Sequence, residues 1–147
     1  MLQINEDRVP SVINWASKRD KIDSPDPWSP ANWKNIQLNL SAQIFIISEK
    51  TQYFGLALYF VDEISQQAHL VKIFVCGEMQ GQGLGNFLLQ QSLNILKDRA
   101  IKSTMLEVAQ SNLIAVNVYL KNDFKTVVSV KDFYGTGRHA YRMLRLL

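Results

Sequence analysis

The sequence predicts a single α/β domain over residues 1–147, with helices flanking a mixed β-sheet and a β-hairpin at the C-terminal end. Three observations carry this prediction. A length of 147 residues fits one compact domain. Strand-like apolar runs alternate with stretches of helical spacing. The order of the elements is a strand, two helices, a three-stranded meander, a helix, a strand, a helix and a hairpin, which is typical of a mixed sheet.

Composition excludes several classes of protein. A chain with 47% hydrophobic and 20% charged residues is typical of globular proteins rather than disordered, collagenous or coiled-coil ones. No apolar run approaches the ~20 residues of a membrane span, and no secretory leader is visible. The single cysteine, Cys76, cannot form an internal disulfide, and with two histidines it cannot complete a zinc site. We expect a cytoplasmic protein with no metal and no membrane partner.

The charge is unevenly spread along the chain. Residues 1–73 carry seven basic and eight acidic residues, whereas residues 74–147 carry nine basic and five acidic ones. The basic second half is compatible with an anionic ligand and equally with a solvated surface. Its basic residues form no uninterrupted cluster, so we expect no nucleic-acid partner.

The N-terminal part predicts a short strand at Leu2–Ile4 and then a helix. Apolar residues at i, i+3, i+4 and i+7 indicate the helix, namely Val9, Val12, Ile13 and Ala16. Asp7 is the expected N-cap, and Pro10 falls in the first turn, where proline is tolerated.

A proline-rich loop follows this helix, because three of the four prolines lie between Pro25 and Pro30. Ser29 and Pro30 form an N-cap and a first helical residue, which predicts a second helix through about Leu38. Trp15 and Trp33 fit the buried faces of the two helices.

The middle of the chain predicts a three-stranded meander. Gln43–Ser48 and Tyr53–Val61 are apolar runs joined by a polar turn, and Gln67–Val75 is the third strand. The remaining elements are a helix to about Arg99, a strand, a second helix and a terminal hairpin around Gly135–Gly137. The last strand, helix and hairpin arms cover Ser103–Ala109, Asn112–Asn122, Phe124–Tyr134 and His139–Leu146. Apolar side chains expected to face the core on the two helices include Leu84, Phe87, Leu88, Ile95, Leu96, Ala115, Val116, Tyr119 and Leu120.

The strongest local signal is the glycine turn Gly81–Gly85 between a strand and a helix. Helix N-termini attract anions, and glycines let a phosphate approach the backbone. The turn lacks the lysine of a Walker loop and has G-x-G-x-G rather than the dinucleotide pattern G-x-G-x-x-G. From the residues alone, a phosphate loop and a tight turn without ligand remain equally open.

The surroundings of this turn make it specific. Gln80, Gly83 and Gly85 match the motif Gln/Arg-x-x-Gly-x-Gly/Ala, and further motifs lie at Leu106–Val108, at Ser111–Phe124 and at Asp132–Tyr134. Together they resemble the GNAT N-acetyltransferase family along the whole chain. The hairpin motif and the early Asp26-Pro27-Trp28-Ser29 are similar to the branch of ribosomal-protein alanine N-acetyltransferases.

The resemblance implies acetyl-CoA as cosubstrate. The backbone of Ile73, Phe74 and Val75 would pair with the pantetheine arm, and the Val75 amide would stabilise the oxyanion. Asn112 would hydrogen-bond the cofactor. The loop residues implied to hold the pyrophosphate are Gln80, Gly81, Gln82, Gly83, Leu84, Gly85 and Asn86.

Three side chains are the candidates for chemistry. The resemblance makes Glu107 the general base, and we expect its pKa to be raised at the interior end of an apolar strand; the alternative is an outward-facing carboxylate. Tyr119, two helical turns after Asn112, is the candidate acid for the departing thiolate, with core packing as the alternative. Tyr134 either contacts the substrate or packs in the hairpin.

The remaining polar candidates have simpler expectations. His69 and His139 are expected to be surface or hairpin residues rather than catalysts. The acidic residues Asp20, Asp23 and Asp26 either attract a basic peptide or are solvated turn residues. Asp123 precedes Phe124 where a left-handed residue is expected, a conformation that aspartate tolerates.

The resemblance therefore implies an acyltransferase that acetylates a protein N-terminal α-amino group. The N-terminal alanine of a small-subunit ribosomal protein is the candidate acceptor, and a protein N-terminal peptide is the expected partner. A lysine or small-amine acetyltransferase and a catalytically silent acyl-CoA-binding module are the alternatives.

Overall fold

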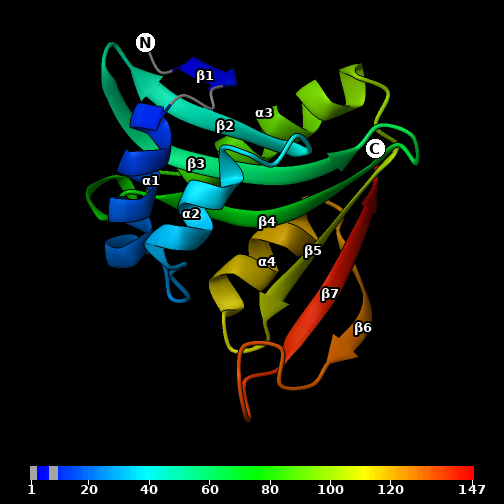
Figure 1. Ribbon diagram of the computed structural model, residues 1–147. Helices are drawn as coiled ribbons and strands as arrows, with labels where there is room; N and C mark the ends of the chain where they lie inside the picture. Colours follow the sequence, from blue (N-terminus) through cyan, green and yellow to red (C-terminus); the bar gives the residue numbers. More distant parts are fainter. Residues whose placement is uncertain (1–2, 7–9) are drawn as a thin grey trace.

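A computed structural model describes residues 3–6 and 10–147 of the chain. Its described strands form one sheet in the order β1-β2-β3-β4-β5-β7-β6 (Figure 1). Neighbouring strands are antiparallel except β4 and β5, which are parallel. The strand bounds are β1 Gln3–Glu6, β2 Ala42–Glu49, β3 Gln52–Asp62, β4 Gln67–Val75, β5 Ser103–Ala109, β6 Lys125–Val130 and β7 Ala140–Leu146. The predicted mixed sheet with a C-terminal hairpin is confirmed.

Helices cover the sheet on both faces. Helices α1 (Pro10–Asp23) and α2 (Pro30–Ile36) lie on one face, and α3 (Leu84–Asp98) lies behind the sheet in Figure 1. Helix α4 (Leu113–Lys121) packs with α3 into the same hydrophobic cluster, and a short 3₁₀ turn, η1, covers Gly77–Met79. The two faces therefore carry two separate hydrophobic clusters.

The first two helices follow the predicted signals with one difference. Pro10 opens α1, whereas the predicted N-cap Asp7, the helix residue Val9 and Leu2 of the predicted first strand lie outside the described residues. The Ser29 Oγ accepts from the Asn32 amide at 3.1 Å and caps α2 as expected. Helix α2 ends at Ile36 rather than Leu38, because Leu38 is 82% exposed and finds no apolar surface to cover.

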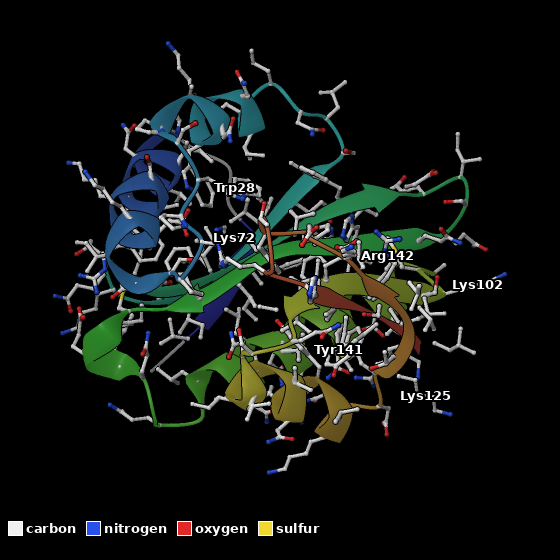
Figure 2. All side chains as sticks on the ribbon, turned by 90° about the horizontal axis from the view of Figure 1, so that it is seen from below. Trp28, Lys72, Lys102, Lys125, Tyr141 and Arg142 are labelled. Carbon is white, nitrogen blue, oxygen red and sulfur yellow. The ribbon has the colours of Figure 1, made fainter. Side chains whose placement is uncertain are left out.

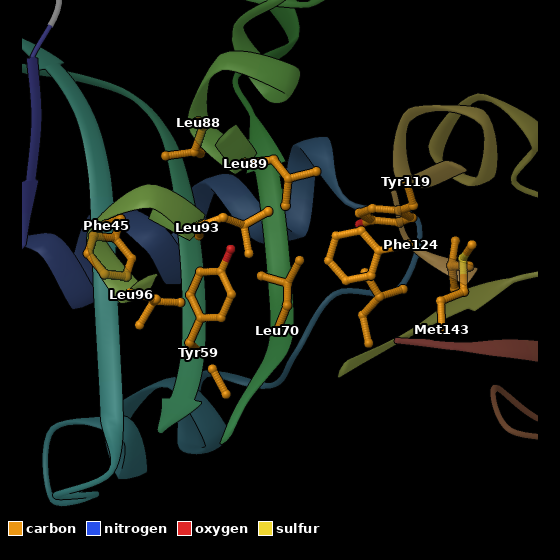
Figure 3. Packing of buried hydrophobic residues seen from close by; sticks show 14 of the residues in the cluster. Phe45, Tyr59, Leu70, Leu88, Leu89, Leu93, Leu96, Tyr119, Phe124 and Met143 are labelled. Atoms are coloured by element: carbon orange, nitrogen blue, oxygen red, sulfur yellow. The ribbon is translucent and has the colours of Figure 1, made fainter. Parts of the chain in front are cut away.

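The larger cluster lies between the sheet and helices α3 and α4 (Figure 3). Leu88, Leu96 and Tyr119 are buried there as predicted. Phe87 and Leu120 were expected in the same stripe, but they are 38% and 50% exposed and lie at the edges of the helix faces. Fully buried Trp33 belongs to the cluster under α1 and α2, against which Trp15 packs from a partly buried position.

The terminal hairpin is shorter than its sequence pattern predicts. Strand β6 ends at Val130 instead of Tyr134, because residues 131–137 form a turn in which Asp132 has a φ of 53°. Asp123 has a φ of 63°, which confirms the predicted left-handed residue after α4.

Candidate active site

A gap opens between the parallel strands β4 and β5. Their pairing begins at Gln67↔Ser103 and ends at Leu70↔Leu106, although both strands continue beyond these residues. The register of β3 and β4 shifts at this level, so that Val71 has no partner residue. Such a bulge bends the strand and increases its twist. Figure 1 shows β4 and β5 diverging from one another after their shared start.

Backbone groups of β4 point into this gap. The Cys76 amide donates to the Phe54 carbonyl at 2.8 Å, so the peptide groups of Cys76 and Phe74 face β3. Because hydrogen-bonded and non-hydrogen-bonded pairs alternate in an antiparallel ladder, Ile73 and Val75 direct their N–H and C=O groups away from β3. The Val75 carbonyl accepts a hydrogen bond from the side-chain Nε2 of Gln80 at 2.9 Å, and the Val75 N–H faces the gap.

The glycine turn leaves the start of α3 open. Gly81 and Gly83 have φ angles of 75° and 78°, and a Cβ at either would meet no atom within 4 Å. Gly83 is the N-cap and offers no side chain, and Phe87 donates the first helical hydrogen bond to its carbonyl at 3.0 Å. The backbone amides before Phe87 therefore make no hydrogen bond within the helix and point out of its end, where an anion is favoured. These are the amides of Leu84, Gly85 and Asn86.

Two cavities meet beside the gap. The larger, about 960 Å³, lies among the loop 24–28, strands β4 and β5, helix α4 and the turn after β6. The smaller, about 150 Å³, lies between β4 and the helices α3 and α4 and includes Gly85 and Asn86. Ile73, Ala115 and Tyr119 line both cavities. The structure therefore brings the open helix end and the larger cavity to one point of contact.

Tyr119 stands at this contact point. Its ring packs edge-on against Phe124 at a centroid distance of 5.7 Å, and the side chain is 8% exposed. Burial, with a smaller effect from Tyr134, raises the pKa of the Tyr119 hydroxyl well above its ordinary value. The hydroxyl therefore stays protonated at any physiological pH. Asn112, at the start of the same helix, lines the larger cavity and caps α4 by accepting from the Ala115 amide at 3.2 Å.

Two side chains hold the Glu107 carboxylate in the larger cavity. Its Oε2 is 2.6 Å from His69 Nε2, and its Oε1 accepts from Arg142 Nε at 2.9 Å. The side chain is 7% exposed. Glu107 thus faces the cavity from the sheet face opposite to the larger cluster, rather than facing bulk solvent.

The expected direction of the Glu107 pKa is wrong. Burial acts to raise this pKa, but hydrogen bonds and charge from His69 and Arg142 together outweigh burial and lower it. The expectation considered only the apolar neighbours in the strand. The two opposing partners come from β4 and β7, which the sequence alone does not place beside Glu107.

Tyr134 reaches the backbone of Glu107 from the turn after β6. Its hydroxyl donates to the Glu107 backbone carbonyl at 3.3 Å, and burial raises its pKa to about 12. The side chain lines the larger cavity, beside Arg138, whose guanidinium lies 5.6 Å from the Tyr134 ring centroid.

Asp20 and Lys72 hold the proline-rich loop onto β4. Asp20 is fully buried, and its Oδ2 accepts from the Trp28 amide at 2.8 Å and from Trp33 Nε1 at 2.9 Å. Lys72 Nζ lies 3.0 Å from Asp20 Oδ1 and donates to the Asp26 carbonyl at 2.7 Å. Figure 2 shows Lys72 beside Trp28, where the ammonium is 5.1 Å from the ring centroid.

Asp20 is therefore not a solvated turn residue, contrary to one of the two expectations. Asp23 accepts from Arg19 at 2.8 Å and from the Gly77 amide at 3.0 Å. Asp26 pairs with Arg138 at 2.7 Å, a contact that joins the proline-rich loop to the turn after β6 across the larger cavity.

Sequence reasoning missed His69 and Arg142. His69 is not an isolated surface residue, because its side chain is 33% exposed and contacts Glu107. Both residues occupy polar positions of alternating strands, which is a signal that they share a face with Glu107 only once the register is known. His139 accepts from the Asp132 amide at 3.0 Å, in keeping with the expected hairpin role.

Among residues 3–6 and 10–147, no cluster of three or more His, Cys, Asp and Glu side chains could hold a metal ion. In the same part of the chain, no helix is long and apolar enough to cross a membrane.

Comparison with known proteins relates this site to one family. The sequence profile of the acetyltransferase (GNAT) domain matches residues 26–145. An N-alpha-acetyltransferase of Sulfolobus acidocaldarius is 33% identical over 84 residues, which cover 56% of this chain and 50% of the relative. The chain thus spans about half the length of this and two further archaeal relatives.

Bacterial proteins match more of the chain. The [ribosomal protein bS18]-alanine N-acetyltransferase of Escherichia coli K12 is 27% identical over 111 residues, covering 75% of this chain and 72% of that protein. The crystal structure of the Escherichia coli ribosomal-protein-S18-alanine N-acetyltransferase superposes with a TM-score of 0.90 at 23% identity, over 99% of this chain and 94% of that one. This likeness confirms the fold.

Proposed function

The chain belongs to the GNAT acetyltransferase family, and we propose that it transfers the acetyl group of acetyl-CoA to the α-amino group of a protein N-terminus. One observation carries the proposal. A small cavity at an open helix end and a large cavity holding a buried carboxylate share Tyr119 as a common wall. Relatives named as N-alpha-acetyltransferases and as ribosomal-protein alanine N-acetyltransferases support the same acceptor class.

The gap and the glycine turn fit acetyl-CoA. The peptide groups of Ile73 offer strand-like hydrogen bonds to the pantetheine amides, and the free N–H of Val75 faces the same gap, whereas Phe74 directs its own peptide groups toward β3. The open amides at the start of α3 suit a pyrophosphate. When bound, acetyl-CoA supplies a reactive thioester. The residues proposed to hold the phosphates are Gln80, Gly81, Gln82, Gly83, Leu84, Gly85 and Asn86, with Asn112 at the other side of the gap.

The acceptor amine would enter through the larger cavity. It must be neutral to attack, and it gives up one proton as its nitrogen bonds to the acetyl carbon. Glu107 and His69 form the pair that takes this proton, directly or through a water molecule. The side-chain hydroxyl of Tyr134, bound to the Glu107 carbonyl, shapes the wall along which the peptide would lie.

The thioester side of the reaction needs two stabilising groups. Negative charge develops on the thioester oxygen, and the Val75 N–H is the donor that faces it in this arrangement. The C–S bond breaks, and the departing sulfur becomes a thiol by taking the proton of the Tyr119 hydroxyl. Burial raises the pKa of Tyr119 and so keeps this proton in place until the sulfur leaves. The tyrosine then regains a proton from solvent, to which the proton held by Glu107 and His69 is released.

An α-amine is the easier acceptor for this machinery. Its ordinary pKa of about 7.7–8.0 leaves a substantial neutral fraction near pH 7.5, whereas lysine, with a pKa of about 10.4, is on the order of a few hundred times less neutral. A lowered Glu107 pKa makes the carboxylate a modest base. The pair would therefore suffice for an α-amine and would handle a lysine poorly.

Release of CoA thiol from acetyl-CoA tests the proposal. We would compare an alanine-starting ribosomal peptide, other N-terminal peptides, and the same peptides with a blocked N-terminus and an internal lysine. Thiol release only with free N-termini is the expected result. Release with blocked peptides or small amines would favour a lysine or small-amine enzyme, and binding of acetyl-CoA without any release would favour a silent module.

A further inference from the structure

Arg142 contacts the proposed proton-accepting pair but has no part in the chemistry described so far. It stands directly opposite Glu107 in the antiparallel ladder of β5 and β7. Its Nε donates to Glu107 Oε1 at 2.9 Å, while its own side chain is 36% exposed. Arginine cannot be deprotonated in a protein. One of the two oxygens of the buried Glu107 carboxylate is therefore paired with a permanently charged side chain. Figure 2 shows where Arg142 lies on the sheet.

The second oxygen of the same carboxylate faces His69. An ionised carboxylate has only acceptor atoms. With Glu107 ionised, the 2.6 Å contact requires His69 Nε2 to carry hydrogen and donate. A neutral imidazole has one protonated nitrogen, so its lone pair is then on Nδ1. The ionisation of Glu107 thus decides which His69 nitrogen can take a proton.

A protonated Glu107 would reverse this arrangement. Its carboxyl hydrogen could be donated to Nε2, and the neutral ring would then carry hydrogen on Nδ1. The side chain is only 7% exposed, and burial favours the uncharged carboxyl. The Arg142 guanidinium opposes that preference from the other oxygen. The remaining nearby cations, Lys72 and Arg138, are held by their own carboxylates, Asp20 and Asp26.

From this geometry, and resting on the proposed function, we propose that Arg142 is a positioning residue that keeps Glu107 ionised, so that His69 holds its hydrogen on Nε2 and offers Nδ1 to the acceptor amine. The lowered pKa of Glu107, to which Arg142 contributes, supports this role. The charged and titratable side chains that line the same cavity from the surrounding elements are Asp26, His69, Lys72, Tyr119, Tyr134 and Arg138.

The test measures Glu107 and His69 by NMR in the full chain without substrate. Carbon-13 titration gives the Glu107 midpoint, and nitrogen-15 shifts give the His69 tautomer. In Arg142→Leu we expect the Glu107 midpoint to rise by about one pH unit or more, and the Nδ1–H tautomer of His69 to replace the Nε2–H tautomer to the extent that Glu107 is protonated. Arg142→Lys retains a charge and should return both signals toward wild type.

Arg145→Leu is the matched control. Arg145 lies three residues along β7, on the opposite face of the strand, and it pairs with Thr104 rather than Glu107. Its loss should leave both signals unchanged. In folded Arg142→Leu protein, an unchanged Glu107 midpoint would overturn the role of Arg142, as would an equal shift in Arg145→Leu.

Turnover adds a readout that a purely structural role would not move. Turnover in Arg142→Leu should fall more at pH 6 than at pH 8, because Glu107 is then protonated over more of the acidic range. An equal loss at both pH values would overturn the positioning role. The NMR signals need no substrate, so a chain that acetylates no amine would instead overturn the proposed function.

Discussion

Asp20→Asn is predicted to destabilise the chain through a single buried contact. The amide retains an oxygen that can accept from the Trp28 amide and from Trp33 Nε1, as Asp20 Oδ2 does. It has no negative charge for Lys72 Nζ, which lies 3.0 Å from the other carboxylate oxygen. The lysine side chain is 7% exposed, so its ammonium would be left without a counter-charge and nearly without water.

The size of the effect follows from this burial. Breaking a buried ion pair by removing one partner typically costs about 3–5 kcal/mol. A chain of this length loses roughly 2–4 °C of melting temperature per kcal/mol. We therefore expect a decrease of roughly 6–20 °C in Asp20→Asn.

A double-mutant cycle isolates the pair. Asp20→Asn combined with Lys72→Met removes both charges and keeps the acceptor for the two tryptophan donors. Because an apolar replacement of a buried pair is often nearly neutral, the double variant should recover most of the loss, with a coupling energy of about 2–3 kcal/mol.

Chemical denaturation of the four proteins measures this coupling, with Lys18→Met as a control for loss of an exposed lysine. The control should stay within about 0.5 kcal/mol of wild type. If Asp20→Asn unfolds within about 1 kcal/mol of wild type, or if the two losses simply add, then the pair does not hold the proline-rich loop and the reasoning fails.

Three further predictions concern the proposed reaction. Gly83→Val should weaken acetyl-CoA binding by about tenfold or more, which corresponds to about 1.4 kcal/mol, because the valine side chain would occupy the open space at the start of α3. Calorimetric titration measures the affinity, and Gly137→Val, at a similar φ of 76°, is the control for backbone strain. Tyr119→Phe should lower turnover by ~10²–10⁴ with little change in cofactor affinity, and a loss within about twofold would mean that another group serves the sulfur. Glu107→Gln should lower turnover at pH 7 by ~10²–10⁴, with the loss shrinking above pH 8 as the α-amine becomes neutral; a constant loss across a pH–rate profile would indicate positioning alone. Because its folded-state pKa is lowered, Glu107 also contributes stability that is present above its unfolded pKa and lost as pH falls through the folded one, so Glu107→Gln should flatten the acid side of the stability curve.

Most of the fold could be predicted because local patterns set the element bounds. Strands β4 and β5 have the bounds that their apolar runs predict, Gln67–Val75 and Ser103–Ala109, because polar residues punctuate both ends. Helix α2 and strand β6 are shorter than predicted, because where each one ends depends on tertiary contacts that the local sequence pattern does not contain. Leu38 finds no apolar surface to cover, and Asp132 lies in a turn.

In the candidate site, too, features within one segment could be predicted, whereas contacts between segments could not. The open helix end and the two-turn spacing of Asn112 and Tyr119 lie within single segments, so sequence motifs predict them. The contacts of Glu107 join three strands, and a slip of one residue in any register would turn a side chain to the other face. His69 and Arg142 therefore could not be placed beside Glu107 from the sequence, and the direction of the Glu107 pKa depends on both.

Asp20 shows a related limit of sequence reasoning. Acidic residues near prolines are typical of solvated turns, yet Asp20 belongs to the last turns of α1 and is fully buried. Its partners are a lysine 52 positions later and two tryptophans of the next segment. The pattern of residues around Asp20 gives no sign of Lys72, which the bulged strand β4 carries to it.

Competition within one peptide would test the proposed function most directly. An alanine-starting peptide with a free α-amine and an internal lysine is incubated with acetyl-CoA and the chain at pH 7.5, and tandem mass spectrometry maps the acetyl group. We predict acetylation at the α-amine, reduced by ~10²–10⁴ in Tyr119→Phe. Acetylation at the lysine, or equal acetylation in the variant, would contradict N-terminal transfer at the junction of the two cavities.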